Sequence, residues 1–256
     1  MTVVVEDMTV RAGRSTLVED VSFSVPAGSW CTIIGPNGAG KTSLITALAG
    51  LRGLAKGRVL VMDLDVHAQS ERQRAHVLAF VPQNPTVPVG MSLRDYVVLG
   101  RTAAHGVLRG PSTADLAVVD GVLERLDLGA FASRDMATLS GGEGQRAVLA
   151  RTLAQGTTVV FLDEPITGLD VRHQLDMMAL LRKEVDECQL TVVATLHDLT
   201  LASSVTDQLV LLSHGRVVEK GPAAEVLRRD SLSAVYGTTL RVFTVDGRDV
   251  VLPSSK

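Results

Sequence analysis

The chain has 256 residues, 46% of them hydrophobic, and a formal net charge of −3. This length suits one or two domains with a large core, and the mild negative charge offers no electrostatic footprint for nucleic acid, so we expect no nucleic-acid partner. The two cysteines, Cys31 and Cys188, lack metal-ligand spacing and indicate reduced thiols in a cytosolic protein. No run approaches the ~20 apolar residues of a membrane span, and the N-terminus lacks a secretion-signal pattern, so we expect neither.

Three short strand-like runs mark the N-terminal quarter, at residues 2–5, 21–25 and 58–62. Their β-branched residues predict strands of an antiparallel sheet. Between the second and third runs lies an apolar stretch at residues 30–34, followed by a glycine-rich turn and an amphipathic pattern over residues 41–51. This order predicts a buried strand, a tight loop and a helix.

The glycine-rich turn fits the pattern G-x-x-x-x-G-K-[ST] of a phosphate-binding loop. Its glycines let the backbone curl until successive amides point at phosphate oxygens, and the helix N-terminus adds partial positive charge. We expect Lys41 to bridge the β- and γ-phosphates of a nucleoside triphosphate, Thr42 to ligate Mg²⁺, and Ser43 to cap the helix or contact the α-phosphate. A chance glycine-rich loop is the alternative, and the flanking strand and helix count against it. The loop residues are Gly35, Pro36, Asn37, Gly38, Ala39, Gly40, Lys41 and Thr42.

The middle of the chain is predicted to be helical, at residues 92–99 and at residues 112–126 with Ser112 as N-cap. Ser140 and Glu143 then form the S-x-x-E pattern of a capping box, which opens a helical run ending near residue 155. The glycines between them leave this helix N-terminus open, and such an end is an anion site.

Two later strand-like runs end in residues that carry chemistry. Residues 158–162 lead into Asp163 and Glu164, and residues 191–196 lead into His197. Parallel sheets bind ligands beyond the carboxyl ends of their strands, so we expect Asp163 to hold Mg²⁺, Glu164 to polarise an attacking water, and His197 to reach the same γ-phosphate. A surface turn is the alternative for the acidic pair, and a structural histidine the alternative for His197.

The C-terminal half alternates strands and helices. A helical pattern at residues 171–185 and a strand beginning at residue 208 complete a parallel α/β arrangement. Residues 241–252 alternate around Asp246-Gly247, which predicts a β-hairpin with a tight primed turn and a structural role.

Taken in order, these segments resemble the ATPase subunit of an ATP-binding cassette (ABC) transporter, over nearly the whole sequence. The phosphate loop corresponds to the family's Walker A motif and the acidic strand to Walker B. Gln83 corresponds to the Q-loop, which ligates Mg²⁺ and senses the membrane partner. The signature corresponds to Ser140-Gly141-Gly142, the D-loop to Gly168-Leu169-Asp170, and the switch histidine to His197.

The resemblance implies a P-loop NTPase (RecA-like) α/β core with an N-terminal antiparallel β-subdomain and an inserted α-helical subdomain at about residues 84–155. We expect one ATP-binding domain over residues 1–240 and a hairpin appendage over residues 241–256. The residues implied to bind ATP are those of the phosphate loop together with Ser43, Gln83, Ser140, Gly141, Gly142, Glu143, Asp170 and His197. The resemblance further implies that Lys41, Glu164 and His197 are catalytic and that Thr42, Gln83 and Asp163 hold the metal.

The resemblance also implies partners, because the chain carries one phosphate loop and the family sandwiches ATP between two subunits. We expect a homodimer or a pairing with a related ABC ATPase subunit. Integral membrane permease subunits, a substrate-binding protein and a place at the cytoplasmic face of the membrane complete the implied system.

Two positions depart from the family pattern. Glu143 stands where glutamine is most common, and since a carboxylate would repel phosphate, we infer that it folds back to cap the Ser140 amide. Residues 8–17 contain no aromatic side chain for stacking on adenine. Arg11 or Arg14 offers a planar guanidinium instead, although exposed arginines are usually solvated. We therefore expect weak base discrimination, with GTP tolerated.

The sequence marks at residues 99–102, 173–175, 196–199 and 235–237 resemble importers of iron-siderophore complexes, haem or cobalamin, with zinc or manganese importers as the nearest competitors. A soluble ABC ATPase in a cytosolic assembly process, such as iron–sulfur cluster biogenesis, is the alternative function. A module that binds without hydrolysing is disfavoured because Lys41, Glu164 and His197 are all present.

Overall fold

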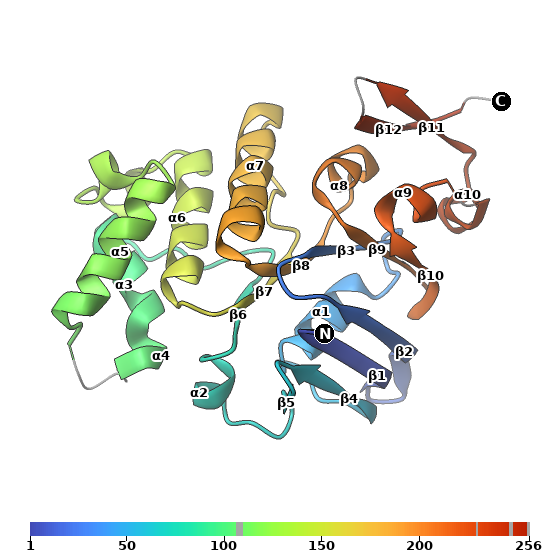
Figure 1. Ribbon diagram of the computed structural model, residues 1–256, viewed down its shortest axis with the longest axis horizontal. Coiled ribbons are helices and arrows are strands. Elements are labelled where there is room, and N and C mark those ends of the chain that lie inside the picture. Colours follow the sequence, from blue (N-terminus) through green and yellow to red (C-terminus); the bar gives the residue numbers. More distant parts are fainter. Residues whose placement is uncertain (106–109, 229, 246–247, 255–256) are drawn as a thin grey trace.

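The structure is a computed structural model that describes residues 1–105, 110–228, 230–245 and 248–254. A six-stranded sheet in the order β10-β9-β3-β8-β7-β6 forms its centre (Figure 1). The strands β6, β7, β8, β3 and β9 are parallel, and β10 pairs antiparallel with β9. Their bounds are β3 Trp30–Ile34, β6 Leu78–Val81, β7 Val159–Asp163, β8 Thr191–Thr195, β9 Gln208–Ser213 and β10 Arg216–Pro222.

The strands β3, β7 and β8 are buried at every residue, as expected for parallel strands covered on both faces. They agree with the apolar runs of the sequence within one residue at each end. Strands β6 and β10 were not predicted. Strand β10 alternates exposed and half-buried residues along its length, because it forms an edge of the sheet.

A smaller antiparallel sheet in the order β2-β1-β4-β5 lies beside the first. The predicted antiparallel pairing is confirmed, but β1 and β2 are ten and eleven residues long rather than the four and five predicted. Register shifts interrupt their pairing, and Asp7 and Asp20 take positive φ there, which breaks the apolar alternation that marks a strand in sequence. The bounds are β1 Val3–Ala12, β2 Ser15–Val25, β4 Lys56–Val61 and β5 Leu64–Asp65.

Helix α1, Lys41–Leu48, lies between the two sheets. It contacts β1 and β2 on one side and β7 and β8 on the other. The opposite face of the large sheet is covered by α7 and α8, so apolar side chains form a separate core on each face. The remaining helices near the C-terminus are short. The bounds are α7 Val171–Cys188, α8 Leu199–Val205, α9 Ala223–Val226 and α10 Asp230–Tyr236.

Helices α3 to α6 form a layer at the end of the sheet where β6 lies (Figure 1). Ser112 caps α5 as predicted, and Ser92, for which no cap was predicted, caps α3 in the same way. Each hydroxyl accepts a backbone N–H three residues on, at 3.2 Å for Ser112 and 3.1 Å for Ser92. The helices are α3 Leu93–Val98, α4 Thr102–His105, α5 Thr113–Arg125 and α6 Gly141–Ala154, with α2 Glu71–Arg74 on the connection before β6 and 3₁₀ turns at Leu99–Arg101, Gly129–Phe131 and Met136–Thr138.

The predicted C-terminal hairpin is confirmed as β11, Leu240–Val245, paired with β12, Arg248–Pro253. The turn predicted at residues 246–247 lies outside the described residues. The hairpin packs on α8, where the Val251 amide donates to Thr200 Oγ1 at 3.1 Å. The division into a domain ending at residue 240 and an appendage stays a prediction. Nowhere in the described ranges is there a helix with the length and apolarity needed to cross a membrane.

At Gly100 the 3₁₀ turn after α3 packs closely against the backbone of α6, and substitution of this glycine tests that packing. A Cβ at Gly100 would lie 2.2 Å from the carbonyl oxygen of Arg151 in α6, a backbone atom that cannot turn aside. We expect Gly100→Ala to lower the free energy of unfolding by about 1–3 kcal/mol in urea denaturation. Gly121→Ala in α5 is the control, because nothing lies within 4 Å of its Cβ, and it should raise stability by up to about 1 kcal/mol. Equal effects at both glycines would contradict the packing account.

Candidate functional site

A cavity of about 550 Å³ lies at the carboxyl ends of β3, β7 and β8. The phosphate loop and the start of α1 supply its floor, and the end of β8 and the turn between β9 and β10 contribute to its walls. Its lining residues are Thr16, Leu17, Asn37, Gly38, Gly40, Lys41, Thr42, Ser43, Glu164, His197, His214 and Gly215. This position is where parallel sheets bind ligands.

The phosphate loop has the tight backbone that its glycines predict. Gly35 has φ 153° and Gly40 has φ 102°, backbone angles that residues with a side chain rarely adopt. A Cβ at Gly35 would lie 2.2 Å from the Leu212 carbonyl oxygen, and a Cβ at Gly40 would lie 2.7 Å from that of Leu17. Glycine is therefore required at both positions.

Lys41 is buried at the base of this loop. Its Nζ donates to the carbonyl oxygens of Gly35 and Pro36, at 2.8 and 3.2 Å. Burial lowers the pKa of Lys41, and the negative charges of Glu164 and Asp163 act in the opposite direction. The ammonium thus stands within the loop, facing acceptors that an anion could replace.

The acidic pair at the end of β7 is held by a residue of the neighbouring strand. Thr195 Oγ1 donates to Asp163 Oδ1 at 2.7 Å and accepts the amide N–H of Glu164 at 2.8 Å. Thr42 Oγ1 lies 3.4 Å from the same Asp163 oxygen. Asp163, Glu164 and Thr195 are all buried, and Glu164 takes φ 50°, a strained conformation of the kind that collects at functional sites.

Three side chains converge on the Glu164 carboxylate. Gln83 Nε2 donates to Oε2 at 2.7 Å, and Thr167 Oγ1 donates to the same oxygen at 3.1 Å. His197 Nε2 contacts Oε1. The structure therefore brings together Glu164, His197 and Gln83, which come from three separate parts of the sequence, around one carboxylate beside the phosphate loop.

The start of α6 has the predicted reciprocal cap. The Ser140 amide donates to Glu143 Oε2 at 2.7 Å, and the Glu143 amide donates to Ser140 Oγ at 3.3 Å. The hydrogen bond from the Ser140 backbone lowers the pKa of Glu143 and keeps the carboxylate charged. The inference that Glu143 folds back is confirmed. Ser140, Gly141, Gly142 and Glu143 do not line the cavity above the phosphate loop.

Asp170 caps α7 and also contacts the start of α6 through His173. The His173 ring packs directly against Gly142, because a Cβ at Gly142 would lie only 2.1 Å from His173 Cδ2. Asp170 Oδ2 lies 2.8 Å from His173 Nδ1, and its Oδ1 accepts the His173 amide. Asp170 therefore lies at the junction of two helices and not in the cavity.

Sequence reasoning missed Thr195, Thr167 and His214. Thr195 is the last residue of an otherwise mostly apolar strand, and a threonine at that position was a usable signal. Its role depends on register, since Thr195 pairs with Asp163 across β7 and β8. No local pattern revealed Thr167 or His214.

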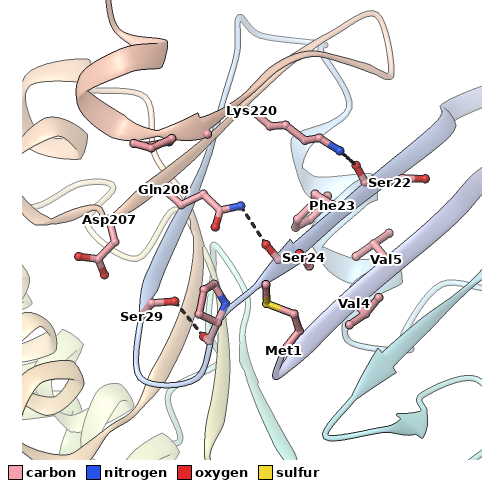
Figure 2. A pocket seen from close by; sticks show the side chains of 13 residues that line it. Met1, Val4, Val5, Ser22, Phe23, Ser24, Ser29, Asp207, Gln208 and Lys220 are labelled. Atoms are coloured by element: carbon pink, nitrogen blue, oxygen red, sulfur yellow. Dashed lines mark hydrogen bonds between the residues drawn. The ribbon is translucent and has the colours of Figure 1, made fainter.

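A larger cavity, of about 650 Å³, lies between β1, β2 and the β9–β10 pair (Figure 2). Its two longest polar side chains, Lys220 and Gln208, already donate to backbone carbonyls. Lys220 Nζ donates to the Ser22 carbonyl at 2.6 Å, and Gln208 Nε2 donates to that of Ser24 at 2.9 Å. Because these two donors are already engaged, we do not assign chemistry to this cavity.

The family can now be stated from comparison with known proteins. A family model described as ABC transporter matches residues 18–167. The chain belongs to this family. Its cassettes bind ATP, and the predicted resemblance is confirmed.

Two relatives are 39% identical to this chain over 95% of its length. They are the cobalamin import ATP-binding protein BtuD of Halobacterium salinarum and the hemin import ATP-binding protein HmuV of Rhodococcus jostii. The iron(3+)-hydroxamate import ATP-binding protein FhuC of Bacillus subtilis is 32% identical over 93% of the chain and 89% of its own length. The chain spans 61% of the length of the BtuD relative and 82% of that of HmuV.

Solved structures agree on the fold. A chain from an inward-facing transporter described as being of metal-chelate type superposes with a TM-score of 0.87 at 24% identity, covering all of this chain and 98% of that one. An ATP-binding cassette in its ADP conformation gives a TM-score of 0.82 at 22% identity, covering 92% and 98%. The predicted α/β P-loop fold, with its β-subdomain and helical insertion, is confirmed.

Thr195→Val tests whether the buried hydroxyl positions both carboxylates. The variant keeps the shape of the side chain but leaves the Glu164 amide and Asp163 without that partner. We expect the free energy of unfolding to fall by about 1–3 kcal/mol and ATP turnover to fall about tenfold or more. Thr32→Val is the control, because within the described residues this equally buried hydroxyl pairs with Thr206 alone. If both variants lose stability but keep turnover, Thr195 is structural alone.

Glu143→Gln tests the capping account of the signature helix. Glutamine also closes a capping box, so we expect turnover and ATP-dependent dimerisation to change by less than about twofold. A severalfold rise in either, measured by phosphate release and size-exclusion chromatography, would mean that the carboxylate opposes phosphate. Ser140→Ala should lower stability by about 0.5–2 kcal/mol, because it removes the cap itself.

Proposed function

We propose that this protein is the ATP-hydrolysing subunit of an import system and that it powers a separate membrane permease for an iron-siderophore, haem or cobalamin-type substrate. The observation that carries the ATPase assignment is the convergence of Gln83, Thr167 and His197 on Glu164 beside the phosphate loop. The printed names of the relatives, which are import ATP-binding proteins for cobalamin, hemin and iron-hydroxamate, support the substrate class.

In this proposal the triphosphate lies along the phosphate loop. The loop amides and the N-terminus of α1 receive its oxygens, and Lys41 turns from the Gly35 and Pro36 carbonyls to the β- and γ-phosphates. Exchanging two neutral acceptors for charged ones strengthens its hydrogen bonds. A buried ammonium gains most from such a change, because water screens it little.

The residues beside the loop fit Mg²⁺. Thr42 Oγ1 and Asp163 Oδ1 are oxygen donors 3.4 Å apart, and Mg²⁺ usually takes one or two protein oxygens together with water and substrate phosphates. Gln83 is the third proposed ligand, although its amide N–H bonds Glu164 in this structure. When bound, the metal would neutralise charge on the β- and γ-phosphates.

Glu164 is the proposed general base. The carboxylate accepts a proton from water as the water oxygen bonds the γ-phosphorus and the bond to the β-phosphate oxygen breaks, which gives ADP and phosphate. In this structure its oxygens are occupied by Gln83, Thr167 and His197. Among the described residues Oε1 has His197 as its one partner, so a second acceptor position on that oxygen stays open to the attacking water.

One chain supplies half of each proposed site. The capped N-terminus of α6 is exposed and lies outside the cavity, so a second copy or a related subunit would bring its Ser140 end over the γ-phosphate. ATP would then join the two subunits, and hydrolysis would release them.

A groove beside Gln83 is the proposed contact for the permease at the cytoplasmic face of the membrane. It has a volume of about 290 Å³ and lies between the loop after β6 and the helical layer, with Pro85, Tyr96 and Arg151 among its lining residues. Val89 in the same loop is 84% exposed, an apolar side chain available to a partner. A substrate-binding protein would deliver cargo to that permease.

Glu164→Gln should abolish hydrolysis while leaving ATP binding intact. We expect turnover to fall at least about 100-fold, since the amide cannot accept the proton. Glu187→Gln, at an exposed position of α7, should behave as wild type. Unchanged turnover in Glu164→Gln would remove Glu164 as the base and would favour a module that binds without hydrolysing.

The same variant identifies the partner. Cells expressing Glu164→Gln would be lysed with ATP and Mg²⁺, membranes extracted in mild detergent, and stoichiometric partners identified by mass spectrometry. The import assignment predicts a polytopic permease. If only soluble partners are recovered, the chain acts in a cytosolic assembly process and the import assignment fails.

A further inference from the structure

We propose that His214 supplies the aromatic face on which the nucleotide base stacks. This inference rests on the proposed nucleotide site. Residues 8–17 contain no aromatic side chain, yet a purine ring system needs an apolar or planar surface where it leaves the phosphate loop. The His214 imidazole is the only ring besides His197 that lines the described cavity above that loop.

The two arginines that the sequence offered for this task do not line that cavity. Arg11 lines a different one, of about 500 Å³, together with Glu19, Lys56 and Arg216. Arg14 is exposed and lines neither. A guanidinium from this part of the chain is therefore not in place to stack.

The order of strands gives the direction in which a nucleotide would lie. The sheet runs β9-β3-β8-β7, so the phosphate loop after β3 lies between the ends of β7 and β8 on one side and the end of β9 on the other. Glu164 and His197 follow β7 and β8 and mark the γ-phosphate end. His214 follows β9, so the base end of the cavity lies at His214, Thr16 and Leu17.

His214 occupies a turn whose backbone conformation other residue types adopt with less strain. Strand β9 ends at Ser213 and β10 begins at Arg216, so His214 and Gly215 form a two-residue hairpin turn with φ 47° and 77°. Two positive φ values define a type I′ turn, for which Asn-Gly is strongly preferred. A histidine there adds backbone strain, and residues under such strain collect at ligand sites.

The turn is fixed to the phosphate loop and to β2. The Gly215 amide donates to the Ala39 carbonyl at 2.9 Å, and the Glu19 amide donates to the Gly215 carbonyl at 2.8 Å. A Cβ at Gly215 would lie 2.6 Å from the Leu17 carbonyl oxygen. The backbone that carries the ring therefore cannot move independently of the loop that would hold the phosphates.

The imidazole itself is uncommitted. It is exposed, and no hydrogen bond or ion pair joins it to another residue in the described part of the chain. Leu17, half-buried, adds aliphatic surface to the same end of the cavity. Stacking between a ring and a purine tolerates any base, because every base has a π-face, so this arrangement predicts similar contributions to adenine and guanine nucleotides.

The test separates the base from the phosphates by titrating the full chain with ADP, GDP and inorganic pyrophosphate in a calorimeter. His214→Asn removes the ring and keeps a residue that favours the turn. We expect this variant to bind ADP and GDP about 5- to 20-fold more weakly and pyrophosphate within about twofold of wild type. His214→Tyr restores a ring and should recover most of the ADP affinity, with thermal melting used to check that each variant is folded.

Arg14→Ala is the matched control and should bind ADP as wild type does. Unchanged ADP affinity in His214→Asn would overturn the proposal. So would an equal loss for pyrophosphate, which would mean that the turn shapes the phosphate loop and does not contact the base. Failure of the wild-type chain to bind either ADP or pyrophosphate would instead reject the proposed nucleotide site, and the stacking role with it.

Discussion

Two adjacent carboxylates at the end of β7 are the constraint around which the site is built. Asp163 and Glu164 are both buried, and within the described residues no lysine or arginine forms a hydrogen bond or ion pair with either carboxylate. Burial of unpaired charge is costly, so neutral donors must solvate them. Thr195, Thr167 and Gln83 do so, and Lys41 lies near enough for its pKa to respond to both carboxylates.

That arrangement explains why the site collects residues from so many elements. Each donor comes from a different segment: β8, the connection after β7, and the loop after β6. The parallel sheet makes this possible, since it brings the carboxyl ends of its strands to one edge. A negatively charged substrate in this cavity would be repelled by the two carboxylates unless positive groups lay opposite them. The phosphate loop, which follows β3, provides those groups as Lys41 and backbone amides.

The sequence predicted the local parts of this site well. The phosphate loop and the Ser140–Glu143 cap each depend on residues within eight positions of one another, and backbone geometry at such spacing is nearly determined by residue type. The strand runs were recognised because they are buried on both faces. Strands β1 and β2 were underestimated, because bulges near Asp7 and Asp20 interrupt the alternation that a strand shows.

The parts that sequence could not supply depend on pairing between distant segments. Thr195 meets Asp163 only through the register of β8 on β7, and His214 reaches the cavity only because β9 lies beside β3. The sequence shows that the first strand lacks an aromatic residue, but it does not show that His214 could stack on the base instead. Nothing in the local pattern around Ser213–Arg216 distinguishes a hairpin turn from a ligand contact.

The contact between Gly142 and His173 ties two functions together that belong to different sites. Through His173 the start of α6 rests on Asp170, seven residues beyond the carboxylate that would meet the metal of its own site. In the proposed dimer, however, the start of α6 faces the nucleotide of the partner subunit. Any shift of the segment after β7 during turnover would therefore move the helix end that faces the opposite nucleotide. The two nucleotide sites would then be coupled, and the coupling would pass through one rigid steric contact and not through a long series of conformational changes.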